Sequence, residues 1–228
     1  QNLMGASKNL MEQTLNYHSN KLTVSSARFA NVAFSLGSLP HAFLTRIENQ
    51  QPIAAPNDVR RFFISHQEAA ELCLMSTALG SNQDIFVPNL SSGVHEKQFS
   101  KIAEDLLMGL GYEPYHCDSE LHAKQLAPEL IPQKKWPCFF SESNTTGEKP
   151  FEEFYADNDI LNTDRFKTIG ITKNLWDQEK IEQFKKFINF AEQGRTKTLD
   201  KSDYITEIQK CVPGLIHKET GKSLDDKM

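Results

Sequence analysis

The sequence predicts an α/β fold in which most strands pair in parallel. Helical and extended segments alternate along the first half of the chain, in the βαβα order that places parallel strands side by side. The helical segments carry apolar residues at a helical period, and the extended segments are short and apolar. With 39% apolar and 10% aromatic residues, the 228-residue chain can bury a core of ordinary size, as one large domain or two small ones.

The predicted helices are defined by apolar periodicity and by residues typical of helix ends. Pro40 lies in the first turn of the second helix, where its missing N–H costs nothing, and Gly111 closes the fourth. The third helix is expected to direct Cys73 into the core. In chain order, we expect helices at residues 5–20, 37–48, 66–79, 96–110, 120–126, 177–192 and 202–212.

The predicted strands are short apolar segments bounded by turns. Residues 22–32 alternate well enough to form one buried strand. The residues after Pro213 are charged and are expected to fray. Further strands or extended segments are expected at residues 52–56, 61–65, 84–88, 112–117, 136–140 and 166–172.

Composition excludes several classes of protein. A net charge of -5 without a basic patch argues against a nucleic-acid partner. No apolar stretch reaches the roughly 20 residues that span a bilayer, and no secretory leader is recognisable. We therefore expect a cytoplasmic protein, although sequence upstream of Gln1 could carry membrane spans. The four cysteines form no C-x-x-C pair and are expected to be reduced structural thiols.

Two motifs that carry chemistry in other proteins are not matched. His116, Cys117, Asp118 and His122 are close in sequence but lack a regular metal-ligand spacing, so we expect no metal. The sequence 109–111 ends a helix, whereas the glycines of a dinucleotide-binding turn open one. The chain therefore contains no glycine-rich phosphate loop of its own.

Lys8 is the first candidate for chemistry. It follows Met4 by four residues, so both side chains lie on one face of the first predicted helix. A lysine in this position can lower the pKa of a proton-transferring neighbour, but a thioether neither accepts nor delivers a proton at neutral pH. On its own, this spacing also fits an ordinary surface lysine near the start of a helix.

The wider pattern resembles a known family. The segments Met4-Gly-Ala-Ser-Lys8, Arg28-Phe-Ala-Asn31-Val32 and Arg60-Arg61-Phe-Phe-Ile occur in the order and at the spacing seen in nucleotide-sugar 4,6-dehydratases of polysaccharide biosynthesis. These enzymes form a branch of the extended short-chain dehydrogenase/reductase family. The resemblance covers about residues 1–110, and it is the combination of segments that makes it specific.

The resemblance implies the C-terminal part of a Rossmann-type extended short-chain dehydrogenase/reductase fold, with a smaller α/β substrate-binding domain. Residues 1–35 would end the dinucleotide-binding domain, residues 36–195 would bind the nucleotide sugar, and residues 196–228 would form a C-terminal helix and tail. NAD(P) would be bound mainly upstream of Gln1, so this chain alone is expected to be inactive.

The family also implies roles for individual residues. Lys8 would bind the nicotinamide ribose, and Met4 stands where many members have the catalytic tyrosine; members with methionine transfer protons through a Thr-Asp-Lys group on an earlier strand. Asn31 and Arg61 would bind the substrate diphosphate, for which a guanidinium offers a planar fork. Arg60 stands where threonine is commoner, so which arginine points inward stays open.

A later segment resembles the family less closely. In Thr145-Thr-Gly-Glu148-Lys-Pro, Glu148 stands where an acidic residue holds the nucleotide ribose. Thr145 replaces the arginine that usually precedes it. A solvated charged turn is an equal alternative here, and residues 173–228 show no resemblance.

The implied substrate is a UDP-N-acetylhexosamine such as UDP-N-acetylglucosamine, which would lose water with NAD(P) as internal redox cofactor. A 4-epimerase of the same family and a non-catalytic nucleotide-sugar binding module are the alternatives. We also expect a homo-oligomer, because Leu10, Met11 and Leu15 offer more apolar surface than one domain face needs.

Overall fold

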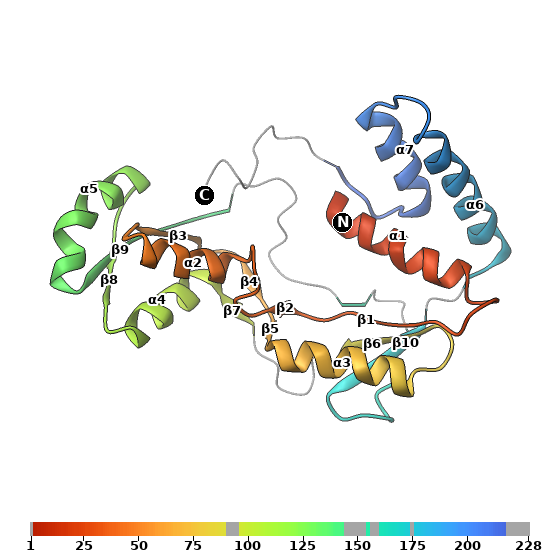
Figure 1. Ribbon diagram of the computed structural model, residues 1–228, viewed down its shortest axis with the longest axis horizontal. Helices are drawn as coiled ribbons and strands as arrows, with labels where there is room; N and C mark the ends of the chain where they lie inside the picture. The colour runs from red at the N-terminus through yellow and green to blue at the C-terminus, as the bar shows by residue number, and fades with distance from the viewer. Residues whose placement is uncertain (1, 90–95, 144–153, 156–159, 174–175, 218–228) are drawn as a thin grey trace.

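The computed structural model describes residues 2–89, 96–143, 154–155, 160–173 and 176–217, which form two lobes (Figure 1). The first lobe holds the chain's first helix and its last two. The second lobe holds the three helices at the other end of the molecule (Figure 1). Within the described residues, no helix is both long and apolar enough to cross a membrane.

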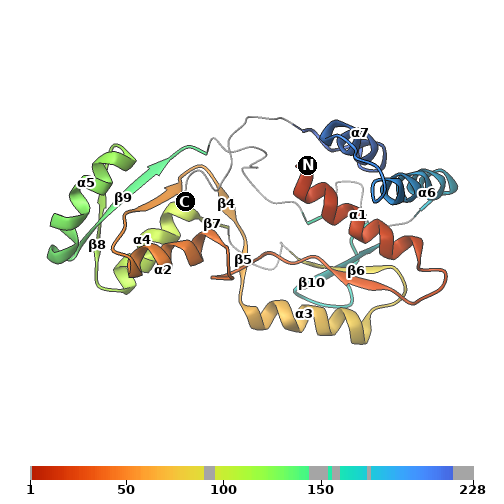
Figure 2. The ribbon, with the colours of Figure 1, turned by 45° about the horizontal axis from the view of Figure 1, so that its top comes forward.

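The first lobe is built on a three-stranded sheet. Its strands are β1 (Ser25–Ala27), β6 (Asp84–Pro88) and β10 (Ile169–Lys173), in the order β1-β6-β10. β1 is parallel to β6, and β10 is antiparallel to it. Figure 2 shows α3 (His66–Leu79) on one side of this sheet and α1 (Leu3–Tyr17) on the other.

After Asp84, the central strand β6 is apolar and supplies both faces of the sheet, as a strand covered on both sides should. Phe86 packs with Leu72 and Ile171 on the α3 side. Its neighbours Ile85 and Val87 point to the opposite face, because successive side chains in a strand alternate. The sheet therefore separates two apolar clusters within the first lobe.

The two C-terminal helices pack on α1. α6 (Gln178–Gln193) and α7 (Lys201–Cys211) join α1 through a cluster of five buried residues: Ala6, Leu10, Phe184, Val212 and Leu215. Leu10 is thus buried within the chain itself. The expectation that it offers apolar surface to a second subunit is wrong for this one of the three residues. Met11 and Leu15 are exposed, as expected.

The second lobe has an all-parallel sheet. Its strands are β3 (Ile53–Pro56), β9 (Lys135–Ser141) and β8 (Glu113–His116), in the order β3-β9-β8. Around it lie α2 (Leu39–Glu48), α4 (Phe99–Gly109) and α5 (Glu120–Leu130), which continues into the short 3-10 helix η2 (Ile131–Gln133). Phe43, Leu107 and Trp136 are almost fully buried in one shared core.

Four short strands lie where the chain passes between the lobes (Figure 1). β2 (Asn31–Val32) is parallel to β5 (Phe63–Ile64), and β4 (Arg60–Arg61) is antiparallel to β7 (Lys97–Gln98). We call this region the junction. The first lobe takes elements from all three regions expected along the sequence, and the roles expected for those regions stay predictions.

The α/β class and the predominance of parallel pairing are confirmed. The single strand expected at residues 22–32 is wrong. Its two ends pair in different sheets, β1 with β6 and β2 with β5, because the chain leaves the first lobe after Ala27.

Cys73 is exposed, so its expected place in the core is wrong. The buried residues of α3 are Ala69, Leu72 and Ser76. Apolar residues occur on every side of this helix, and neighbours in sequence lie about 100° apart around its axis. The sequence pattern therefore did not show which side faces the sheet.

Candidate functional site

α1 presents Met4 and Lys8 at the surface. The helix is continuous from Leu3 to Tyr17, and Asn2 caps it by accepting a hydrogen bond from the Gly5 N–H at 2.8 Å. Met4 and Lys8 are therefore one turn apart, and both are exposed. The end of α1 that carries them lies toward the junction in both ribbon views (Figures 1 and 2).

Asn31 and Arg61 lie on short neighbouring strands of the junction, and both are half-buried. The backbone N–H of Asn31 donates to the Phe62 carbonyl oxygen at 3.1 Å, and its side-chain Nδ2 donates to the same oxygen at 3.4 Å. The fold thereby brings Asn31 beside the residue that follows Arg61. Two candidates 30 positions apart in sequence are thus neighbours in space.

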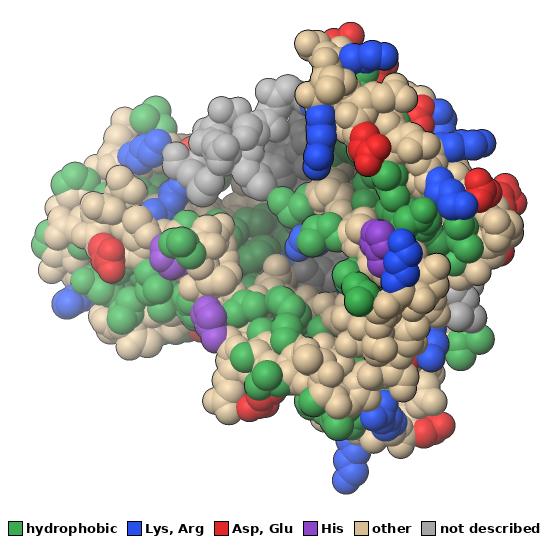
Figure 3. Space-filling view, turned by 45° about the vertical axis from the view of Figure 1, so that its right-hand side comes forward, with side chains coloured by type: hydrophobic (Ala, Val, Ile, Leu, Met, Phe, Trp, Pro, Cys, Tyr) green, Lys and Arg blue, Asp and Glu red, His purple; other side chains and the backbone are tan. Residues whose placement is uncertain are grey.

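The two arginines of β4 differ in exposure. Arg60 is exposed, whereas Arg61 is half-buried and its guanidinium donates to the Arg60 carbonyl oxygen at 2.7 Å. A half-buried guanidinium is more favourable for a placed anion contact than a fully solvated one, because bulk water competes less. Figure 3 shows the surface hollowed between the two lobes.

One partly buried ion pair was not foreseen from the sequence. Arg28 donates from two guanidinium nitrogens to both carboxylate oxygens of Glu12, each at 2.7 Å. A third nitrogen donates to the Phe154 carbonyl oxygen at 2.8 Å. The available signal was that Glu12 follows Lys8 by four residues and therefore shares its side of α1. Glu148 lies outside the described residues, as does Thr145.

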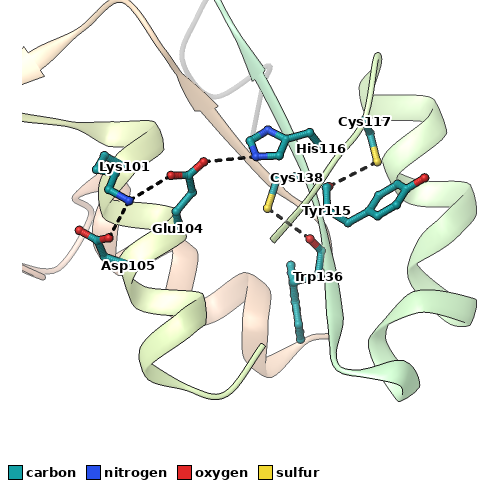
Figure 4. Close-up of polar contacts among 8 residues, drawn as sticks. All are labelled: Lys101, Glu104, Asp105, Tyr115, His116, Cys117, Trp136 and Cys138. Atoms are coloured by element: carbon teal, nitrogen blue, oxygen red, sulfur yellow. Dashed lines mark hydrogen bonds and ion pairs between the residues drawn. The ribbon is translucent and has the colours of Figure 1, made fainter. Parts of the chain in front are cut away.

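The histidine and cysteine residues near residue 116 lie in the second lobe, away from this site (Figures 1 and 4). The His116 Nε2 lies 3.3 Å from the Glu104 carboxylate, which also contacts Lys101 at 3.4 Å. In the part of the chain that is described, no three potential ligand side chains gather into a metal site.

The two buried thiols of the second lobe are poor nucleophiles. Burial raises the pKa of Cys138 to about 12 and also raises the pKa of Cys117, because a thiolate is poorly solvated there. Their S–H groups donate weakly to the carbonyl oxygens of Trp136 and Tyr115 (Figure 4). Both cysteines therefore act as small apolar core residues.

Comparison with known proteins identifies the family. Residues 1–174 match a family described as polysaccharide biosynthesis protein. The chain belongs to this family. The matched residues include α1, the junction and both sheets, and they end before α6 begins at Gln178.

Individual relatives are more distant. The capsular polysaccharide biosynthesis protein CapD of Staphylococcus aureus is 33% identical over 97 residues, which are 41% of this chain and 16% of CapD. The uncharacterized membrane protein MJ1061 of Methanocaldococcus jannaschii is 26% identical over 176 residues, 75% of this chain and 47% of that protein. The X-ray structure of Pen from Bacillus thuringiensis is 18% identical, covering 75% of this chain and 47% of Pen, with a TM-score of 0.49.

The chain spans less than half the length of each of these curated relatives.

Proposed function

We propose that the protein is a nucleotide-sugar 4,6-dehydratase of polysaccharide biosynthesis that acts on a UDP-N-acetylhexosamine, with UDP-N-acetylglucosamine as the first candidate. Two observations support this proposal: Asn31 hydrogen-bonds to Phe62, the residue after Arg61, and Lys8 is exposed on the end of α1 that lies toward the junction. A Rossmann-type fold of the extended short-chain dehydrogenase/reductase kind is part of the same proposal.

One residue of this chain, Lys8, fits the binding of NAD(P). The Lys8 ammonium is exposed and so can reach the hydroxyl groups of a nicotinamide ribose, to which it would donate hydrogen bonds. When bound, NAD(P) would supply the hydride acceptor and donor that lets the sugar lose water across C5 and C6 without net oxidation. The phosphates of the cofactor would be held by other parts of the protein, since this chain has no glycine-rich loop.

The remaining residues would bind and orient the substrate. Arg61 would bind diphosphate oxygens through its planar fork, and Asn31 would donate from its amide. Glu148 would accept hydrogen bonds from the nucleotide ribose. Met4 cannot transfer a proton, so the acid and base of the reaction would lie outside this chain.

The test uses the full-length protein that contains this chain, incubated with UDP-N-acetylglucosamine. A dehydratase gives a product lighter by one water, which mass spectrometry detects. An epimerase gives a product of unchanged mass, and a binding module gives no product. Recovery of the substrate alone, from a protein that binds it, would refute the dehydratase assignment.

Lys8→Ala should abolish turnover of the full-length protein with little loss of stability, because the exposed side chain buries little area on folding. Lys21→Ala, which removes an exposed lysine beyond the end of α1, is the matched control and should stay active. Met4→Ala should also stay active. Turnover at the wild-type rate in Lys8→Ala would remove the cofactor role.

The expected homo-oligomer remains part of this proposal. Met11 and Leu15 are 67% and 44% exposed on α1, so this helix carries apolar surface that a second subunit could cover. Light scattering of the full-length protein gives its mass in solution, and a monomer would contradict the expectation.

A further inference from the structure

We propose that Arg28 is a positioning residue of this enzyme, which holds α1, and with it Lys8, in place against the strand that leads to Asn31. The inference rests on the proposed function in assigning Lys8 to the cofactor. Its structural part, the attachment of α1 through Arg28, stands on the contacts of three residues alone.

The base of the Arg28 side chain is fixed. Arg28 follows β1, and its backbone N–H donates to the Phe86 carbonyl oxygen of the central strand β6 at 2.8 Å. From this anchored position the guanidinium reaches Glu12 on α1 with two nearly parallel hydrogen bonds of 2.7 Å. A fork of this kind fixes orientation as well as distance.

The Arg28–Glu12 contact restricts rotation and sliding of α1, which its apolar packing does not. Ala6 and Leu10 pack against α6 and α7 through non-directional contacts, which tolerate small rotations of the helix about its axis. Glu12 lies one turn after Lys8, so any rotation or sliding of α1 that moves the Lys8 ammonium also strains the Glu12–Arg28 fork. The fork therefore restrains the part of α1 from which the Lys8 side chain extends.

The same guanidinium connects α1 to the substrate side of the site. Its third hydrogen bond goes to the carbonyl oxygen of Phe154, whose ring packs against Phe62 with 5.7 Å between centroids. Phe62 in turn accepts the hydrogen bonds of Asn31 and follows Arg61 in the chain. Arg28 thus joins the Lys8 helix to the two proposed diphosphate ligands through one buried aromatic contact.

The degree of burial suits a positioning role. The side chains of Arg28 and Glu12 are 26% and 20% exposed. The pair is less screened than a surface ion pair, which is worth little, yet it is hydrated enough to avoid the full desolvation cost of a buried pair. We therefore expect its loss to misplace α1 more than it unfolds the protein.

The test measures kinetics and hydrogen exchange in the full-length enzyme with four variants. Arg28→Lys keeps the charge but removes the fork, and Glu12→Gln keeps the shape but removes the charge. The double variant Glu12→Arg/Arg28→Glu restores the pair in reverse. Arg165→Ala is the matched control, since it removes an arginine of the same lobe that donates to a backbone carbonyl, that of Leu79, at 2.7 Å.

We expect Arg28→Lys and Glu12→Gln to lower kcat about tenfold to a hundredfold, the cost of a small misplacement at a reacting centre, with KM for the nucleotide sugar nearly unchanged. Hydrogen exchange should rise in α1 and not in the second lobe. The reversed pair should recover part of kcat, and Arg165→Ala should change neither kcat nor exchange in α1.

Unchanged kcat together with unchanged exchange in α1 would overturn the inference. So would loss of protection throughout both lobes, or an equal loss of kcat in Arg165→Ala, since either would show general destabilisation. If the wild-type protein does not turn over nucleotide sugars, the proposed function fails; raised exchange confined to α1 in Arg28→Lys would still support the attachment.

Discussion

The two lobes bury their apolar residues in different ways. In the second lobe, Phe43, Ile53, Leu107, Trp136 and Cys138 belong to one connected core around β9. In the first lobe, the described apolar residues divide into three smaller clusters, on the two faces of the sheet and between α1, α6 and α7. A single close-packed core resists displacement of its parts, whereas separate clusters let one layer shift against another.

This difference explains why a directional contact matters in the first lobe. α1 carries Lys8 but contributes only Ala6 and Leu10 as fully buried apolar residues. The element nearest to the proposed chemistry is thus held by a small apolar contact, by the hydrogen bond from Gln13 Nε2 to the Cys211 carbonyl oxygen at 2.9 Å, and by the Arg28–Glu12 fork. The second lobe, with its larger core, lies on the other side of the junction.

Truncating a buried core residue should have the largest effect on stability. It also tests whether the two lobes are destabilised separately. Leu107→Ala removes a fully buried side chain of the second lobe and should cost about 2–5 kcal/mol of stability there. Phe184→Ala should cost about 3–5 kcal/mol but act on the cluster of α1, α6 and α7. Hydrogen exchange resolved by peptide should show each loss confined to its own lobe. Equal loss in both lobes after either change would show one cooperative unit.

Arg61 should have the next largest effect, on binding. Arg61→Ala should weaken nucleotide-sugar binding by about 1.5–3 kcal/mol, the range for hydrogen bonds to charged groups, which is about a tenfold to hundredfold rise in Kd. Arg61→Lys should recover only part of this, because an ammonium lacks the fork. Arg60→Ala is the matched control and should do much less, since Arg60 is exposed. Isothermal titration calorimetry measures all three, and equal losses at both arginines would indicate a diffuse positive field.

The smallest expected effect, on stability, concerns the hydrogen-bonded cap at the start of α3. Glu68 accepts hydrogen bonds from the Ser65 backbone N–H at 2.7 Å and the Ser65 hydroxyl at 2.9 Å, and these lower the pKa of its carboxyl. A carboxyl whose pKa is lowered on folding contributes stability at pH values above its unfolded-state pKa of about 4.3. That contribution is lost as the pH falls through the folded-state pKa. Glu68→Gln should therefore lower stability slightly at neutral pH and reduce the loss on acidification, as measured by urea unfolding across pH. An identical pH dependence in the variant would contradict this assignment.

The elements themselves were largely predictable from local sequence. α3 was expected at residues 66–79 and is observed at His66–Leu79, because the Ser65–Glu68 capping box marks its start and Gly80 follows its end. β6 was likewise expected at residues 84–88, where a short apolar run lies between turns. Such signals depend on neighbours a few positions away, so they survive in any tertiary context that keeps the element.

The site was predictable only as a set of positions. The spacing of Met4 and Lys8 placed them one turn apart on a helix that the structure confirms. The meeting of Asn31 with the residue after Arg61 depends on the pairing of β2 with β5, which no local pattern specifies. The roles assigned to these residues remain predictions.

Tertiary structure alone decided what each side chain touches. It split residues 22–32 between two sheets and turned Cys73 outward. It also joined Arg28 to Phe154, 126 positions later in the chain. Local sequence determines where a helix or strand forms, because the backbone period is local. Which face is buried, and which distant carbonyl or carboxylate a charged side chain finds, depends on segments that meet only when the whole core closes.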